Sequence, residues 1–524
     1  MSAQAAAILQ ASPVRLTPQP ASAPNEVLVL CDRADLAGAG AYLDSRGATL
    51  ATMVGLDLTP LGEDYALEYV YSLPAFDEFI RLRADIPRDD PEYPSVTPLL
   101  PAAQWYEREA KDLLGIIPVG HPDPRRLVLH DAWPRGYHPL RKEISATEAP
   151  PLANRRFDYF EVQGEGIYEL PVGPIHAGII EPGHFRFSNA GELILHLDAR
   201  LFYTHRGVEK IVEGKSFEDA LFTVERTCGV CTVSHAVSFC SAVERMARAE
   251  LSPAATWLRT LLLELERLYN HVGDIGNICA GAGFHLGSSQ GAILKERLQR
   301  LNETLTGHRF LMGVVGLGGL RYDLEPGVLT SSLETLREIR RDFEAYMGAV
   351  LSSGSFVGRI TGPGHVSAET ALALAGTGVA ARASGVATDY RQEHPHLAYP
   401  RLMMKRQVDS TGDVGARLLV RAREALDSFD AAAELIDSLP SGTAVAAMPP
   451  VPRGASALGY SESPRGANVH WLMADGNSRV YRLRIRSASF ANWPLVTRAV
   501  VENMVPDFPL INKSFELCYA CCDR

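Results

Sequence analysis

The sequence has few cysteines, no long apolar run and no excess of positive charge, and each shortage excludes a class of protein. Eight cysteines in 524 residues are too few for a disulfide framework, so we expect reduced thiols. No stretch reaches the roughly eighteen apolar residues of a membrane-spanning helix, and the N-terminus lacks the pattern of an export signal. The formal net charge of −11 argues against nucleic acid as a partner.

The remaining composition predicts a folded α+β protein with more than one core. Hydrophobic residues make up 46% and charged residues 22%, and the length favours two or three domains. Residues 1–24, rich in alanine and proline, are expected to form a flexible leader. We expect a small α+β domain over 25–145, a linker over 146–156, and a large, mainly helical domain with a peripheral β-sheet over 157–524.

Local patterns predict individual elements. Enrichment in β-branched and aromatic residues predicts strands at EVLVLC, ATLATMVGLDL and YALEYVYSL. The apolar spacing in FDEFIRLRADI predicts a helix. Further strands are expected in GHFRFSNAGELILHLDARLFY and in NVHWLMADGNSRVYRLRIRSASF. Long helices are expected at about 215–250, 254–280, 290–312, 332–352 and 413–438.

Four cysteines form two pairs with chelating spacing. ERTCGVCTVSHAVSFC contains Cys228 and Cys231, and ELCYACCDR repeats the spacing with Cys518 and Cys521. Each pair can place two thiolates on one ion, so the sequence predicts a four-sulfur metal site. Zinc, nickel and an iron–sulfur cluster all accept thiolates. The long separation of the pairs argues against a zinc ribbon, whose pairs lie about 15–20 residues apart, but spacing alone does not choose the metal.

The residues around both pairs resemble those of NiFe hydrogenase large subunits. RTCGVCTVSH resembles the first metal-binding signature of that family, and CYACCDR resembles its C-terminal signature. Segments that include GPIHAGIIEPGHFRF, HRGVEK, LERLYNHVGDIGN and ESPRG resemble energy-converting, membrane-associated group 4 hydrogenases and the 49 kDa subunit of respiratory complex I. This resemblance covers residues 157–524 of the chain.

The N-terminal domain resembles a second complex I subunit, the 30 kDa one, through YEREAKDLLGI, GHPDPRRL and HPLRKE. Fusion of the two modules is typical of large subunits of the formate hydrogenlyase type, including those like hydrogenase-3 and hydrogenase-4. The complex I large subunit has lost the four cysteines and reduces quinone in the equivalent cavity, whereas this chain keeps all four. The resemblance therefore implies a metal-containing enzyme that interconverts H2 with protons and electrons.

The resemblance also assigns the ligands of a nickel–iron centre. Cys228 and Cys518 would bind nickel alone, while Cys231 and Cys521 would bridge nickel and iron, and the iron would carry cyanide and carbon monoxide. Glu181 of EPGHFRF is the expected ligand of a magnesium or iron ion near the C-terminus.

Catalytic roles follow in the same way. Glu209 of HRGVEK matches the proton-relay glutamate of the family, because H2 cleavage releases a proton that needs a carboxylate. Arg465 of ESPRG, with Pro464 beside it, matches an arginine above the open metal position, and Asp274 matches a carboxylate near it. The ordinary alternatives are an exposed charge for Glu209, a structural ion pair for Arg465, and a solvated helix face for Asp274.

The sequence departs from the family immediately before the second cysteine pair. The family generally has Asp-Pro there, whereas this chain has Glu516-Leu517. A carboxylate is retained on a side chain one methylene longer, but the proline that would fix φ is absent. Glu516 is therefore a further candidate catalytic residue.

The cysteine count also indicates partners. With its plausible cysteines committed, we expect no Fe–S cluster in this chain, so electrons would come through a small subunit with a 4Fe–4S cluster. The family further implies a ferredoxin-like Fe–S subunit, antiporter-like membrane subunits, and formate dehydrogenase or ferredoxin as electron donor. We expect a cytoplasmic protein attached peripherally to the inner face of the membrane. The alternative is a complex I-like quinone-module or scaffold subunit with zinc or no metal.

Overall fold

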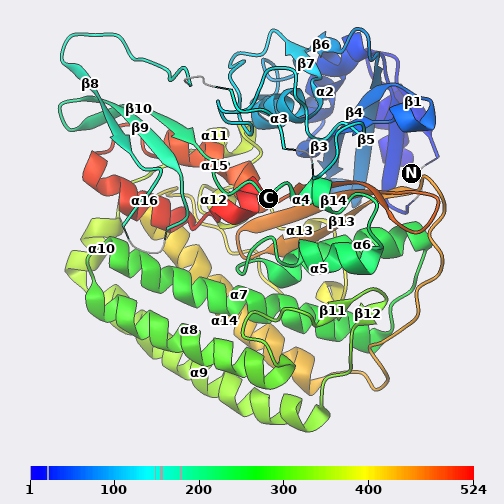
Figure 1. Ribbon diagram of the computed structural model, residues 1–524. Coiled ribbons are helices and arrows are strands. Elements are labelled where there is room, and N and C mark those ends of the chain that lie inside the picture. The colour runs from blue at the N-terminus through cyan, green and yellow to red at the C-terminus, as the bar shows by residue number, and fades with distance from the viewer. Residues whose placement is uncertain (1, 21–22, 148, 154–156, 178–179) are drawn as a thin grey trace.

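The N-terminal domain is built on one mixed sheet. The computed structural model (Figure 1) describes the chain except residues 1, 21–22, 148, 154–156 and 178–179. The sheet has the order β1-β2-β5-β4-β3. Its strands are β1 (Thr17–Gln19), β2 (Glu26–Leu30), β3 (Thr49–Asp57), β4 (Tyr65–Leu73) and β5 (Glu78–Ile86). The domain also contains α1 (Ala3–Gln10), α2 (Leu36–Ser45), α3 (Gln104–Leu114), β6 (Glu92–Pro94) and β7 (Ile117–Val119).

Two sequence predictions for this domain are wrong. FDEFIRLRADI forms strand β5, because this segment pairs with β2 on one side and β4 on the other, and sheet pairing overrides its helical spacing. Much of the expected flexible leader is folded: Ala5 and Leu9 of α1 are buried, and β1 pairs with β2. Apolar burial and strand pairing thus attach residues 3–19 to the domain. Residues 1 and 21–22 of that leader lie outside the described residues.

The large domain contains a layer of long helices below the N-terminal domain in Figure 1. Helix α7 packs against α6, α8 and α14, and α9 packs against α8 and α14. The predicted long helices are confirmed, except that the cysteine loop divides the expected 215–250 helix into α5 and α6. The helices are α5 (Phe217–Val224), α6 (Thr232–Ala247), α7 (Pro253–Gly281), α8 (His285–Thr306), α9 (Pro326–Ser352) and α14 (Val414–Asp437).

Shorter elements complete the large domain, and its two predicted strand regions are confirmed. One sheet contains β8 (Ile167–Val172), β9 (His184–Ala190) and β10 (Leu193–Arg200), and another contains β13 (Ser456–Ser463), β14 (Gly466–Ala474) and β15 (Val480–Arg486). The remaining elements are β11 (Val315–Gly316), β12 (Gly319–Leu320), α4 (Val208–Ile211), α10 (Gly354–Ile360), α11 (Ala368–Ala373), α12 (Gly378–Arg382), α13 (Tyr390–Glu393), α15 (Ala488–Ala499), α16 (Phe508–Phe515) and α17 (Tyr519–Asp523).

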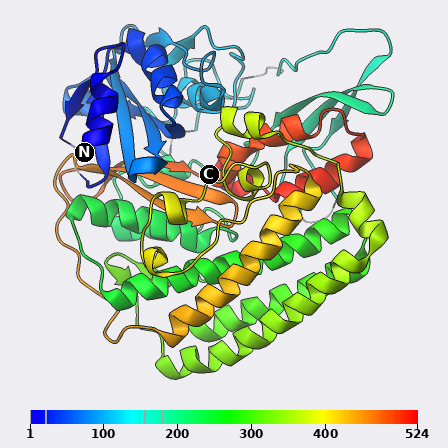
Figure 2. The same ribbon diagram turned by 180° about the vertical axis from the view of Figure 1, so that it is seen from behind.

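The two domains share a buried interface. Apolar residues of β3 and β4 pack in one cluster with Leu458, Val469 and Trp471 of the β13–β15 sheet. The Trp471 indole N–H donates to Glu68 Oε2 at 2.9 Å, and the same carboxylate pairs with Arg81. Every residue of β4 is buried, since its sheet is covered on both faces. Both views place the C-terminus near this interface (Figures 1 and 2).

The mixture of helices and several small sheets confirms the α+β class. The division at 146–156 stays a prediction, and residues 148 and 154–156 of that linker lie outside the described residues. Within the described part of the chain, no helix has both the length and the apolar character required to cross a membrane.

Candidate metal centre

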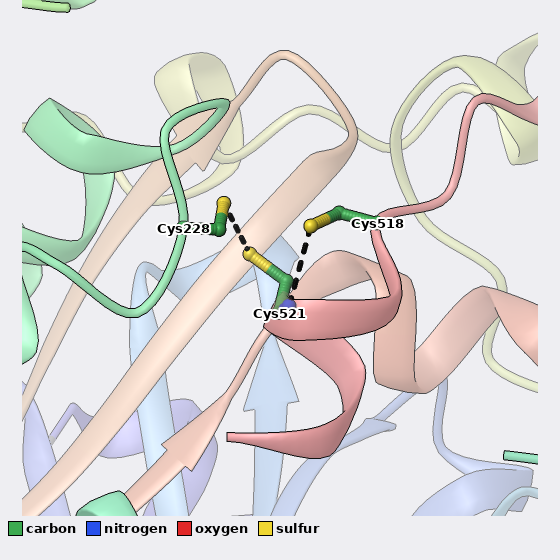
Figure 3. A group of neighbouring side chains, drawn as sticks. All are labelled: Cys228, Cys518 and Cys521. Carbon is green, nitrogen blue, oxygen red and sulfur yellow. Dashed lines mark hydrogen bonds between the residues drawn. The ribbon is translucent and has the colours of Figure 1, made fainter. Parts of the chain in front are cut away.

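The fold brings the two cysteine pairs together from opposite ends of the large domain. Cys228 lies in the α5–α6 loop and Cys231 directly precedes α6, while Cys518 precedes α17 and Cys521 lies within it. The Cys228 and Cys521 sulfur atoms are 2.9 Å apart, and those of Cys228, Cys518 and Cys521 lie within 4.8 Å of one another. Figure 3 shows these three side chains converging.

Cys231 completes the group. Hydrogen bonds with Cys228 and Cys521 lower the pKa of the Cys231 thiol to about 6 although the side chain is buried. None of the four cysteines forms a disulfide. Four soft sulfur donors from two chelating loops, three of them buried and Cys518 partly buried, fit a nickel–iron centre, because thiolates bind both metals.

Helix α7 fixes the first cysteine loop. Tyr269 donates its hydroxyl to Gly229 O at 2.8 Å, and Asn270 donates to Val230 O at 2.9 Å. Glu266 accepts the N–H groups of Val233 and Ser234 at 2.6 and 3.1 Å. These are among the N–H groups that the first turn of a helix cannot pair internally, so Glu266 caps α6 and orients the loop before it.

The second loop is held by residues that flank it in space. Ser489 Oγ accepts the Cys518 N–H at 3.0 Å, and Ser487 Oγ donates to Cys521 O at 2.9 Å. His235 lies between the loops, with Nε2 at 3.2 Å from Cys521 Sγ and Nδ1 at 3.0 Å from His470 Nε2. The sequence did not single out His470, which with Asn468 is one of two polar side chains in the largely apolar strand β14.

Arg465 and Asp274 form a buried ion pair beside the cysteines. Pro464 and Arg465 form the tight turn between β13 and β14. The Arg465 guanidinium donates hydrogen bonds to both Asp274 carboxylate oxygens, one of them at 2.9 Å. Arg421 donates to the same carboxylate at 3.2 Å. Burial alone would raise the pKa of Asp274, but Arg465, His271 and Arg421 hold it well below its usual range. Asp274 is therefore a fixed anion.

The Arg465 guanidinium also lies within electrostatic range of the sulfur site. Its Nε atom is buried and has no hydrogen-bond partner among the described residues. Cys231 and Arg465 perturb each other electrostatically. An unpaired buried N–H is costly, so this donor fits a site that accepts a further ligand beside the arginine.

Glu516 lies at the edge of the same group. It takes a left-handed φ of 53° at the C-terminus of α16, and its Oε1 accepts from Asn277 at 2.5 Å. Burial and the neighbouring Asp274 charge raise the pKa of Glu516 to about 7, against the opposite effect of Arg465. The longer carboxylate therefore still reaches the Asp274–Arg465 pair electrostatically.

Glu209 is buried rather than an exposed helix charge. Its carboxylate accepts from Arg482 at 2.8 Å, from the Ile485 N–H at 3.0 Å, and from Arg484 and Arg524 at 3.2 Å each. Burial would raise its pKa, but Arg482 and Arg484 lower it below its usual range. Among the described residues its hydrogen-bond and ion-pair partners include no cysteine, so a relay role stays a prediction.

The structure corrects the prediction for the polar stripe of α7 and leaves the prediction for Glu181 untested. The polar stripe of α7, which includes Glu264, His271 and Asp274, is buried and not a solvated face, because α14 supplies Glu424 and Arg421 as partners. Glu181 accepts the Ala520 N–H at 2.8 Å. Among the described residues, the cysteines alone form a group of three possible metal ligands, so a Glu181-bound ion stays a prediction.

Comparison with known families agrees with this geometry. The model of the nickel-dependent hydrogenases matches residues 206–274. Models of the 30 Kd and 49 Kd subunits of the respiratory-chain NADH dehydrogenase match residues 29–150, and 291–451 with 447–524. Formate hydrogenlyase subunit 5 of Escherichia coli is 36% identical, covering 91% of this chain and 85% of the relative.

The chain belongs to the formate hydrogenlyase type of hydrogenase large subunit. Hydrogenase-4 component G of Escherichia coli is 35% identical over 91% of this chain and 84% of the relative. A chain of the membrane-bound sulfane sulfur reductase, an archaeal respiratory membrane complex, superposes with a TM-score of 0.63 at 25% identity, covering 69% of this hydrogenase subunit and 99% of the other chain. The matches to the 30 Kd and 49 Kd subunit models confirm the predicted fusion of the two complex I-type modules.

Proposed function

We propose that this hydrogenase subunit holds a nickel–iron centre on Cys228, Cys231, Cys518 and Cys521 and interconverts H2 with protons and electrons, chiefly toward H2 evolution. The observation that carries the proposal is the convergence of the two cysteine pairs, with three sulfur atoms within 4.8 Å. When bound, the centre, with cyanide and carbon monoxide on iron, supplies the redox chemistry at hydrogen.

The chain itself supplies charge, orientation and a proton route. Arg465 presents a guanidinium whose position is fixed by the bidentate contact with Asp274, so it stabilises negative charge beside the sulfur atoms without rearranging. Helix α7 and Glu266 hold the first cysteine loop. Glu209 is the proposed carrier of the proton, and Glu516, beside Asp274 and Arg465, is a second candidate carboxylate.

Electrons would come from outside the chain, since its plausible cysteine ligands are committed to the nickel–iron centre. We infer a small partner subunit with a 4Fe–4S cluster, a ferredoxin-like subunit, and antiporter-like membrane subunits. Formate dehydrogenase or ferredoxin would supply the electrons. The relatives' place in formate hydrogenlyase and in a respiratory membrane complex supports peripheral attachment to the inner face of the cell membrane.

The metal content tests this function. The purified complex should contain one nickel per chain and show infrared bands of iron-bound cyanide and carbon monoxide. Cys518→Ser should abolish both, because it removes a sulfur ligand. Cys522→Ser is the matched control: Cys522 is buried on the same helix, lies outside the converging sulfur group, and should keep both. Zinc in place of nickel, with no infrared bands, would instead support the scaffold alternative.

A further inference from the structure

Helix α14 places two buried arginines, Arg417 and Arg421, against the end of α16. Arg421 donates from Nη1 to Ser514 O at 2.6 Å and from Nη2 to Phe515 O at 3.0 Å. Arg417 donates from Nε to Ser514 Oγ at 2.9 Å, and its guanidinium lies over the Phe515 ring, 4.1 Å from the centroid. These carbonyls are among those that the last turn of a helix cannot pair internally, so Arg421 caps α16.

The same guanidinium reaches a third element. Arg421 Nε donates to Asp274 Oδ2 of α7 at 3.2 Å, and Asp274 is the carboxylate that Arg465 binds with two hydrogen bonds. One planar group therefore joins α14, α7 and the end of α16. A lysine ammonium lacks the rigid fork of donors that these three directions require, so the arrangement is specific for arginine.

Burial of two neighbouring guanidinium groups is unfavourable on its own. Burial, with the charge of Arg421, lowers the pKa of Arg417 to about 9, and burial also lowers the pKa of Arg421. Among the described residues Arg417 forms no ion pair, and Arg421 pairs only with Asp274. A buried charge is tolerated only with good partners, and three of the acceptors are atoms of Ser514 and Phe515. The two arginines and the end of α16 therefore hold each other in place.

The chain turns toward the second cysteine pair immediately after these carbonyls. Glu516 has the left-handed φ of 53°, and Asn277 of α7 donates to its Oε1. Ser489 Oγ then accepts the N–H of Cys518 at 3.0 Å. Because Cys518 follows Phe515 by only three residues, a displacement of the helix end would be carried to the Cys518 thiol.

We propose that Arg421 is the positioning residue of the second cysteine pair. By holding the last two carbonyls of α16 it fixes where the chain turns toward Cys518, and by binding Asp274 it aligns that turn with Arg465. The first cysteine loop has a separate support in Glu266, so the effect of Arg421 is confined to the second loop. Its consequence for a bound metal rests on the proposed function, whereas the placement of the loop does not.

Hydrogen exchange in the full chain, prepared without metal, tests the placement. In Arg421→Met, amides of residues 514–521 should exchange about 10-fold faster or more, because charged hydrogen bonds that oppose local opening are lost. Residues 229–236 of the same molecules should exchange at the wild-type rate. Arg421→Lys, which keeps the charge, should give an intermediate rate. Arg423→Met is the matched control: Arg423 lies on the same helix, its side chain is 43% exposed, and neither segment should change.

A spectroscopic readout on the complete complex accompanies this measurement. The infrared bands of iron-bound carbon monoxide should shift in Arg421→Lys, because the second cysteine pair lies differently against the metals, and should stay in place in Arg423→Met.

The remaining outcomes separate the two proposals. Equal acceleration of both segments in the Arg421 variants, or no acceleration in either, would overturn the positioning role. If the wild-type complex contains zinc and shows no infrared bands, while Arg421→Met still accelerates residues 514–521 alone, the positioning role stands and the proposed function is wrong.

Discussion

At the scale of single residues, neighbours decide what each buried carboxylate can do. Asp274 has a lowered pKa because it is held by two arginines, whereas burial beside Asp274 raises the pKa of Glu516 to about 7. Arg482 and Arg484 lower the pKa of Glu209 against the effect of its burial. Acids of one chemical type thus have pKa values shifted in opposite directions by their neighbours.

Arg465→Lys tests whether activity requires the two-point contact between the Arg465 guanidinium and Asp274. Lysine retains the charge but cannot bind both Asp274 oxygens as guanidinium does. We expect H2 evolution to fall by about 100-fold or more, with nickel and the infrared bands of the centre retained. The exposed Arg479→Lys serves as the control. A fully active Arg465→Lys complex would contradict the proposed role of the guanidinium.

At the scale of elements, strand β5 joins the domains through one of its two alternating faces. Arg81 is buried and pairs with Glu26 and Glu68, and it also donates to Ser456 Oγ at 2.7 Å. Arg83, two residues further on, pairs with Glu63 and Asp85, whose side chains are 57% and 71% exposed. Because successive strand residues point to opposite faces, residues 81 and 83 share a face, and their different burial reflects how far the large domain covers it.

The two arginines provide a matched pair of substitutions. Arg81→Ala leaves buried carboxylates without their partner and should lower the free energy of unfolding by about 3–5 kcal/mol. Arg83→Ala removes only solvent-exposed ion pairs and should cost less than about 1 kcal/mol. Urea unfolding followed by tryptophan fluorescence measures both. Equal losses would mean that the Arg81 network adds nothing to the interface.

At the scale of the whole molecule, the N-terminal domain is a structural part of the catalytic unit. It contributes Glu109 to the Glu209 cluster and Glu68 to the pocket of Trp471. Arg125 also pairs with Asp198 of β10 at 2.5 Å. Glu109 of EREAKD and Arg125 of RRL thus both contact the large domain.

Cutting the linker tests whether these contacts hold the two domains together. A protease site in place of residues 149–153 should allow cleavage without separating the halves, which should co-elute even at high salt, because buried pairs are screened little. Glu68→Lys would place a like charge against Arg81 and should release the N-terminal half after cleavage. Immediate separation of the cut protein without this substitution would show that the linker, not the interface, holds the domains together.

The sequence by itself predicted the two cysteine pairs, the long helices and the family, because these depend on short-range spacing and on motifs read along the chain. The structure was needed for β5, which becomes a strand only between β2 and β4, and for the burial of the α7 polar stripe by α14. Glu109 and Glu209 are 100 residues apart, and Arg524 and Arg484 join them only after folding. Their roles depend on which charges burial brings together, and that is decided by tertiary packing. The four cysteines can therefore be identified from the sequence, whereas the cluster that joins Glu109 and Glu209 through Arg484 and Arg524 exists only in the folded chain.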